Sequence, residues 1–189
     1  SNYFKKNYLR GKDLLKFFPA IFSFNIFASN YDMKKVLITY YSKGEVAKVA
    51  KRMQTSFEKK KFKVTIKEIK LKEEMEIKKQ FKKEKKLELS SMPKSISSYD
   101  IIVIGTQIVS FTSVPAVNAY IRSLPKANEK KVILFATGIG LPGKAIKKMS
   151  SLLSMNGCKV IGSKVFSSIF EFDERKLKEV DAFIESIQV

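Results

Sequence analysis

The sequence predicts an α/β domain built on a doubly wound, five-stranded parallel sheet, preceded by an N-terminal extension. From residue 33 onward, short apolar runs alternate with stretches in which apolar residues recur every three or four positions. The runs at 101–105 and 132–136 are apolar throughout, which is typical of central strands buried on both faces of a parallel sheet. Alternating strands and helices favour parallel pairing through right-handed crossovers, and we expect the strand order 2-1-3-4-5.

The individual elements follow from the periodicity of each stretch. Strands are predicted at residues 36–41, 64–66, 101–105, 132–136 and 160–166. Helices are predicted at residues 46–57, 115–124, 145–153 and 177–187. Residues 72–89 carry a thin apolar stripe among many charges, so we expect a surface helix there, followed by a loop over 90–98.

The composition excludes several kinds of catalysis. The chain has 189 residues, with 37 Lys plus Arg against 18 Asp plus Glu, no His, and a single cysteine, Cys158. Without His there is no Ser-His-Asp or Cys-His group and no histidine metal site. One cysteine excludes an intramolecular disulfide framework, and we expect Cys158 to be a small buried core residue. We therefore expect a cofactor, rather than the side chains, to supply the chemistry.

The net charge of +19 first suggests a polyanionic partner. However, the positive charge is spread along the whole chain, and only four of its residues are arginine. Arginine is the residue favoured for bidentate recognition of bases and phosphates. We therefore predict no specific nucleic acid partner and interpret most of the charge as a solvated lysine surface. Polyanion binding stays open as an alternative, and would show as a steep salt dependence.

Residues 1–32 differ from the rest, so we treat them as an extension that precedes a domain at 33–189. They combine five basic and two acidic residues with an apolar run at 17–28. This run is shorter than the roughly 20 apolar residues that a transmembrane helix needs. Three alternatives remain: a segment packing on its own domain or a partner, an export signal or anchor, and a helix at a membrane surface. We expect a cytoplasmic protein, or a membrane-associated or exported one if the segment is a signal or anchor.

Three loops follow predicted strands and are candidates for a ligand site. Residues 41–46 lead directly from a strand into a helix, whose first N–H groups suit a phosphate. Residues 105–111 contain two hydroxyls and an aromatic ring, and residues 136–140 contain two glycines. In a sheet of order 2-1-3-4-5 these loops converge at the topological switch point, where ligands of such folds bind.

The same three loops carry a resemblance to the flavodoxin-like family, which covers most of residues 33–189. The match to the family's first strand, phosphate loop and first helix is VLITYYSKGEVAKVAKRM. The match to the strand and first flavin-ring loop is IIVIGTQIVS, and that to the fourth strand, second ring loop and next helix is ILFATGIGLPGKAI. The resemblance implies FMN as the cofactor. The residues implied to contact it are Ser42, Lys43, Gly44, Glu45, Val46, Thr106, Gln107, Ile108, Val109, Ser110, Phe111, Thr137, Gly138, Ile139 and Gly140.

The chain also departs from the family pattern. Both threonines of the phosphate loop are missing, and Glu45 places negative charge where the phosphate would lie. Gln107 replaces the usual proline, and Val109 occupies the position of the family's tryptophan. Phe111 or Tyr41 could replace that tryptophan as the ring that stacks on the flavin.

Two functions follow from these observations. The first is an FMN-binding protein that acts in electron transfer or as a small flavin reductase module; if it is an enzyme, it is an FMN-dependent oxidoreductase. Its positive surface would favour an acidic redox partner protein. The second is a flavodoxin fold that has lost flavin binding and serves as a protein- or membrane-interaction module, with residues 1–32 as a possible membrane contact. The oligomeric state is left open.

Overall fold

The computed structural model describes residues 33–41, 44–90, 92, 95–139, 143–167 and 173–188. The predictions for residues 1–32, and the placements of Ser42, Lys43 and Gly140, lie outside the described residues. Everything described belongs to the domain that begins at Met33. Among the helices in these described ranges, none is long and apolar enough to cross a membrane.

The centre of the domain is a parallel sheet with the strand order β2-β1-β3-β5-β6. Its strands are β1 (Lys35–Tyr40), β2 (Lys63–Glu68), β3 (Ile101–Val109), β5 (Lys130–Gly138) and β6 (Cys158–Ser167). Every pair along this path is parallel, which confirms the predicted doubly wound sheet and its order 2-1-3-4-5. A further strand, β4 (Thr112–Ser113), is absent from the sequence prediction and pairs antiparallel with the end of β3.

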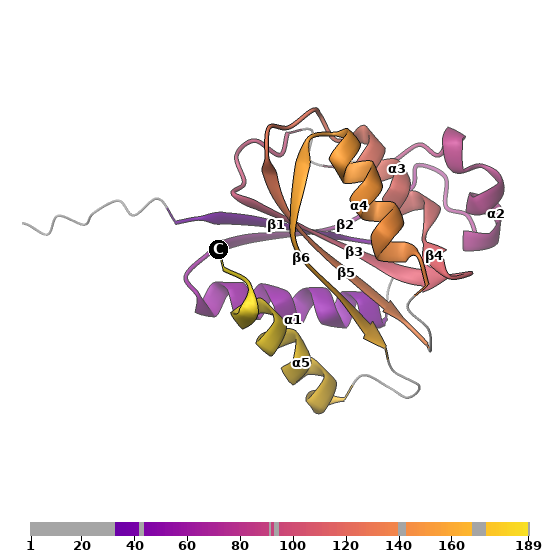
Figure 1. Cartoon of the computed structure of the whole chain (residues 1–189). Coiled ribbons are helices and arrows are strands. Elements are labelled where there is room, and N and C mark those ends of the chain that lie inside the picture. Colours follow the sequence, from indigo (N-terminus) through magenta and orange to yellow (C-terminus); the bar gives the residue numbers. More distant parts are fainter. Residues whose placement is uncertain are drawn as a thin grey trace, which may run out of the picture. The chain divides into compact units, whose positions relative to one another are not determined.

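Helices cover both faces of the sheet (Figure 1). One face carries α1 (Glu45–Lys59) and α5 (Glu174–Ser186), and the other carries α3 (Pro115–Ser123) and α4 (Ala145–Met155). Each pair of helices closes its own apolar core against the sheet, because β1, β3 and β5 present apolar side chains alternately to the two faces. The core under α3 and α4 also contains Cys158, as predicted for that residue.

The predicted surface helix over residues 72–89 is wrong. The structure has only a six-residue helix, α2 (Ile77–Lys82), and a 3₁₀ turn (Glu84–Lys86), and a β-bridge between Leu71 and Leu89 joins the two ends of the segment. Lysines recur here at four-residue spacing, as at Lys78 and Lys82, and like charges so placed repel one another along a helix. A continuous helix is therefore disfavoured in this segment. Contacts of individual residues with the rest of the domain determine the path of the chain instead.

The sheet register places the candidate loops at one edge. Tyr40, the last residue of β1, pairs with Gly105 of β3, and Gln107 pairs with Thr137 of β5. Because all these strands are parallel, the chain leaves each of them at the same carboxyl edge. Gly105 is required by the packing there, since a Cβ at this position would lie 2.0 Å from the Phe135 ring.

Candidate functional site

The start of α1 presents backbone N–H groups at the carboxyl edge of the sheet, and no side chain among the described residues caps them. Gly44 precedes the helix with a left-handed φ of 75°, and its carbonyl oxygen accepts the first helical hydrogen bond, from Lys48 N at 3.0 Å. The N–H groups of residues 45–47 therefore come before the first helical bond. Gly44 has no side chain to cap them, and an added Cβ there would meet no atom within 4 Å. This arrangement suits a phosphate group.

Glu45 is the one acidic residue in the first turn of α1. A carboxylate at this position interacts favourably with the positive end of the helix dipole. The same carboxylate would repel a phosphate bound to these N–H groups. The start of α1 thus has the backbone geometry of an anion site together with a charge that weakens it.

The second loop is a tight hairpin. β3 continues to Val109, which pairs with Thr112 of β4, so that Ser110 and Phe111 form the turn. Both turn residues have positive φ, 50° and 60°, as in the turns that favour Asn-Gly. Left-handed backbone in such residues costs free energy and is retained where the surroundings impose it. The turn leaves the Phe111 side chain 66% exposed at its tip.

Thr106 supports this hairpin with its hydroxyl. The residue is fully buried; its Oγ1 accepts a hydrogen bond from Val114 N at 3.1 Å and donates one to Gln107 O at 3.0 Å. The predicted contact between Thr106 and a ligand therefore falls on a side chain already used within the loop. Beyond it, Gln107, Ile108 and Val109 are half-buried.

The third loop is attached directly to the hairpin. The N–H of Lys144, at the start of α4, donates to Phe111 O at 2.7 Å. Gly143 (φ 58°) makes this contact possible, because a Cβ at position 143 would lie 2.3 Å from the same oxygen. At the end of β5, Thr137 is buried, while Gly138 packs so closely on Ile108 that a Cβ would lie 3.0 Å from the Ile108 Cβ.

The remaining third-loop residue that the structure describes is Ile139, which is 77% exposed. It comes directly after β5, beside the buried end of that strand. Exposed apolar groups therefore stand at both ring loops, Phe111 on one and Ile139 on the other. Such groups are suited to covering a flat aromatic ligand.

Tyr41, the alternative stacking ring, is held elsewhere. Its hydroxyl accepts a hydrogen bond from Gln80 Nε2 at 2.6 Å, and its side chain packs against the core under α3 and α4. Gln80 is fully buried; its Nε2 also donates to Met75 O at 3.1 Å and its Oε1 accepts from Ala116 N at 3.3 Å. Gln80 thereby ties the segment after β1 to the start of α3. No sequence pattern indicates this role, because Gln80 lies among charged residues in a stretch predicted to be a surface helix.

Burial perturbs the pKa of two titratable groups of the sheet, Tyr40 and Cys158. Burial, with a smaller contribution from Glu68, raises the pKa of Tyr40 at the end of β1. Burial also raises the pKa of the Cys158 thiol, so this cysteine is protonated at neutral pH and is a poor nucleophile. Among the described residues, no group of three His, Cys, Asp or Glu side chains is arranged to hold a metal ion.

The fold is one that many solved structures share. A flavoprotein from Lactobacillus acidophilus NCFM in complex with FMN is 22% identical, and the match covers 80% of this chain and 99% of that chain with a TM-score of 0.55. The two-electron reduced flavodoxin of Megasphaera elsdenii is 19% identical, over 77% and 95% of the two chains, with a TM-score of 0.55. A flavodoxin from the domain Archaea is 13% identical, over 79% and 92%, with a TM-score of 0.54.

Comparison of sequences adds no closer relative. No protein-family model matches the chain. No curated protein matches it either. The fold of residues 33–189 is therefore flavodoxin-like, and similarity at these identities establishes the fold alone.

The described residues fit part of what FMN requires. Backbone N–H groups at the start of α1 fit its phosphate, and Phe111 and Ile139 fit its ring. The hydroxyl groups of Thr106 and Tyr41 already make hydrogen bonds within the protein.

Proposed function

We propose that residues 33–189 bind FMN at the carboxyl edge of the sheet and act in electron transfer or as a small flavin reductase module. The observation that carries this proposal is the start of α1 at Gly44, where backbone N–H groups lack a side-chain cap. The flavoprotein of Lactobacillus acidophilus, which has the same fold, is described in complex with FMN. The fold and the helix start support the proposal together, since neither alone specifies a ligand.

In this proposal, each loop at the carboxyl edge of the sheet contacts a different part of FMN. The N–H groups of residues 45–47 hold the phosphate, with Ser42 and Lys43 as predicted additional contacts. Phe111 covers one side of the ring, and the backbone of the 106–111 hairpin and of Gly138 and Ile139 surrounds its edge. Bound FMN would supply the electron-transfer chemistry that the side chains lack.

The surrounding charge sets the electronic environment of that site. The chain carries a net charge of +19, which favours negative charge on a bound flavin. We therefore expect a reduction potential above that of acidic flavodoxins. By the same argument, an acidic protein is the expected redox partner.

FMN titration followed by quenching of flavin fluorescence tests the site. We expect saturable one-to-one quenching by the purified chain, and a roughly two- to tenfold weaker affinity for Phe111→Ala, because aromatic contacts contribute about 0.5–1.5 kcal/mol. Met155→Ala is the matched control, since Met155 is 69% exposed at the far end of α4. Equal affinities for the two variants would exclude Phe111 from the site, and absence of quenching by the unmodified chain would refute the proposal.

Glu45 gives a second test with the opposite sign. Glu45→Gln removes the negative charge from the first turn of α1, so FMN affinity should increase several-fold, by about 0.5–1 kcal/mol. Glu58→Gln, at the last turn of the same helix, changes the net charge equally and should leave the affinity unchanged. A decrease for Glu45→Gln would show that the phosphate does not lie at this helix start.

The second candidate function is a protein-interaction module that has lost the flavin. The observations that favour it are Glu45 in the first turn of α1 and the engagement of Tyr41 by Gln80. The same titration separates the two candidates, because this function predicts no quenching by either the unmodified chain or Glu45→Gln.

A further inference from the structure

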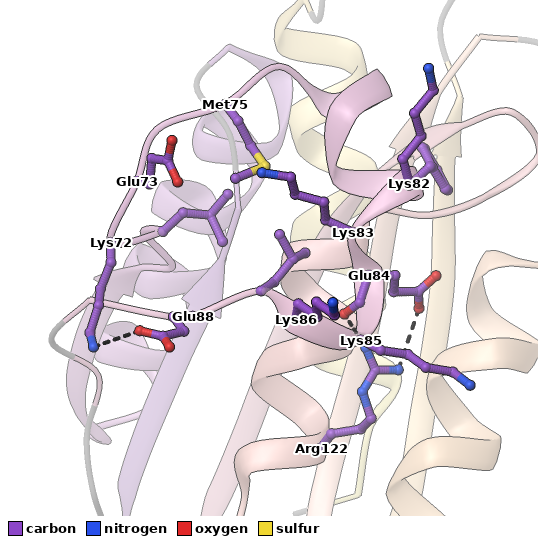
Figure 2. A pocket seen from close by; sticks show the side chains of 13 residues that line it. Lys72, Glu73, Met75, Lys82, Lys83, Glu84, Lys85, Lys86, Glu88 and Arg122 are labelled. Atoms are coloured by element: carbon purple, nitrogen blue, oxygen red, sulfur yellow. Dashed lines mark hydrogen bonds and ion pairs between the residues drawn. The ribbon is translucent and has the colours of Figure 1, made fainter.

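The segment that replaces the predicted surface helix forms a basic groove away from the candidate FMN site. Together with Arg122 of α3, residues 71–88 enclose a cavity of about 1040 Å³ (Figure 2). None of the described site residues lines it. We call this cavity the lysine groove; its apolar lining includes Leu71, Met75 and Leu87, and its lining lysines include Lys82, Lys83, Lys85 and Lys86.

The four cations of the lysine groove have no acidic partner within the described residues, although acids lie close by. Two of the three acids that line the groove are paired, Glu88 with Lys72 at 2.7 Å and Glu84 with Arg122 at 3.4 Å, whereas Glu73 makes no ion pair among the described residues. Glu84 also pairs with Lys148 of α4 at 3.1 Å and accepts a hydrogen bond from Asn118 Nδ2 at 3.0 Å. The ion pairs of Glu84 and Glu88 therefore stabilise the groove. Lys82, Lys83, Lys85 and Lys86 remain available to bind a ligand.

The lysines differ in direction. In Figure 2, Lys83 reaches toward the side of the groove occupied by Met75, whereas Lys82 and Lys85 point away from the opening. All four are exposed, whereas Leu71, Met75 and Leu87, which also line the groove, are buried or half-buried. The lysine groove thus combines a short apolar lining with exposed positive charge.

We propose that the lysine groove binds an acidic segment of a partner protein, with carboxylates on its lysines and an apolar side chain on Leu71, Met75 and Leu87. Charge complementarity carries the proposal, because four lysines that have no acidic partner among the described residues line the same groove. The inference goes beyond FMN binding and does not depend on it, since the groove shares no described residue with that site.

Other anionic partners fit the groove less well. A nucleic acid would be expected to use arginine, but the one arginine here, Arg122, donates to both the carboxylate and the backbone oxygen of Glu84. A membrane surface is flat, whereas the lining residues form a concave groove, which suits a narrow peptide segment better than a bilayer surface.

A binding experiment on the full chain tests the proposal. The probe is a short fluorescein-labelled peptide of glutamate and leucine, followed by fluorescence anisotropy at low and physiological salt. Lys83→Glu with Lys86→Glu should weaken binding at least about tenfold, because reversed charges turn attraction into repulsion. Lys83→Gln with Lys86→Gln should give an intermediate loss, and far-ultraviolet circular dichroism checks that each variant is folded.

The matched control is Lys51→Glu with Lys178→Glu. These exposed lysines lie on α1 and α5, so the net charge changes equally while the groove stays intact. Binding within about twofold of the unmodified chain is expected for this control. An equal loss in both double variants, or a peptide that does not bind, would overturn the proposal.

Two further probes complete the design. The first probe is a suspension of phosphatidylglycerol vesicles. If the vesicles bind through Lys83 and Lys86 more tightly than the peptide does, the lysine groove is a membrane-binding site and the proposal of an acidic protein segment is overturned. The FMN titration, repeated on Lys83→Glu with Lys86→Glu, should be unchanged, so that failure of the groove and failure of the flavin site are told apart.

Discussion

The two faces of the sheet are closed in different ways. On one face, α1 and α5 have 15 and 13 residues and pack along one another, with Arg52 of α1 bonded to Asp181 of α5. On the other face, α3 and α4 have 9 and 11 residues, and residues 69–90 complete the cover with a helix of only six. Two long helices cover the first face, whereas the second combines two shorter helices with an irregular segment that single polar residues attach to them.

This difference has a physical reason. A long amphipathic helix gains stability from many similar apolar contacts, so no single residue is decisive. An irregular segment must find a partner for each buried backbone and side-chain polar group. Gln80 and Glu84 provide those partners on the second face, and we expect this face to be the more sensitive to single substitutions.

The largest effect is expected for Gln80→Leu. It removes the hydrogen bonds to Tyr41, Met75 and Ala116, and leaves the buried Ala116 N–H without a partner, which should lower the free energy of unfolding by about 2–3 kcal/mol. Urea denaturation measures this change. Gln54→Leu on α1, whose side chain bonds only Glu58 on the surface, should change it by less than about 0.5 kcal/mol. Similar losses in both would contradict the contrast between the faces.

A smaller, pH-dependent effect on the free energy of unfolding is expected at the contact between α1 and α5. We call this contact, where Arg52 bonds Asp181, the seam. The hydrogen bond from Arg52 lowers the pKa of Asp181, with a further contribution from Ser56. Its stabilisation is therefore complete above the unfolded pKa of about 3.9 and is lost as the pH falls through the lower folded value.

Asp181→Asn tests this assignment. It should cost roughly 1 kcal/mol at pH 7, and the cost should decrease as the pH falls below about 3.9. Urea denaturation between pH 7 and pH 3 gives the comparison, with the exposed Glu185→Gln on the same helix as control. A cost that is independent of pH would mean that the carboxylate charge contributes nothing to the seam.

The smallest effect is expected for Tyr120→Phe, under α3. The hydroxyl of Tyr120 is buried and makes no hydrogen bond of good geometry with the described residues; burial raises its pKa to about 12, against a smaller lowering by the nearby Thr39 hydroxyl. Removing an unsatisfied polar atom of this kind should leave the free energy of unfolding unchanged or raise it by up to about 1 kcal/mol. Thermal denaturation would measure it, and a clear loss would reveal a partner for the hydroxyl.

The sequence predicted the fold well where apolar residues are continuous or periodic. The five parallel strands and their order were recognisable because β3 and β5 are apolar over most of their length. β4 was missed because two residues are too short to show alternation. Residues 72–89 were misread because a thin apolar stripe has helical spacing whether or not a helix forms.

The candidate site was less predictable than the fold. Spacing alone located the loops, but it could not show that the Thr106 hydroxyl binds Val114 N or that Phe111 O binds Lys144 N. Such contacts depend on where β3 ends and on the positive φ of Ser110, which nothing in a Ser-Phe pair indicates. Gln80 is the extreme case, because its partners are 36 and 39 residues away along the chain.

The most direct test of the central claim is an amide NMR titration of the ¹⁵N-labelled chain with FMN. The account predicts shifts concentrated at Gly44 to Ala47, at the hairpin tip around Phe111, and at Gly138 and Ile139. The seam between α1 and α5 and the lysine groove should remain unchanged. No saturable shift, or shifts confined to Lys82–Leu87, would contradict FMN binding at the carboxyl edge of the sheet.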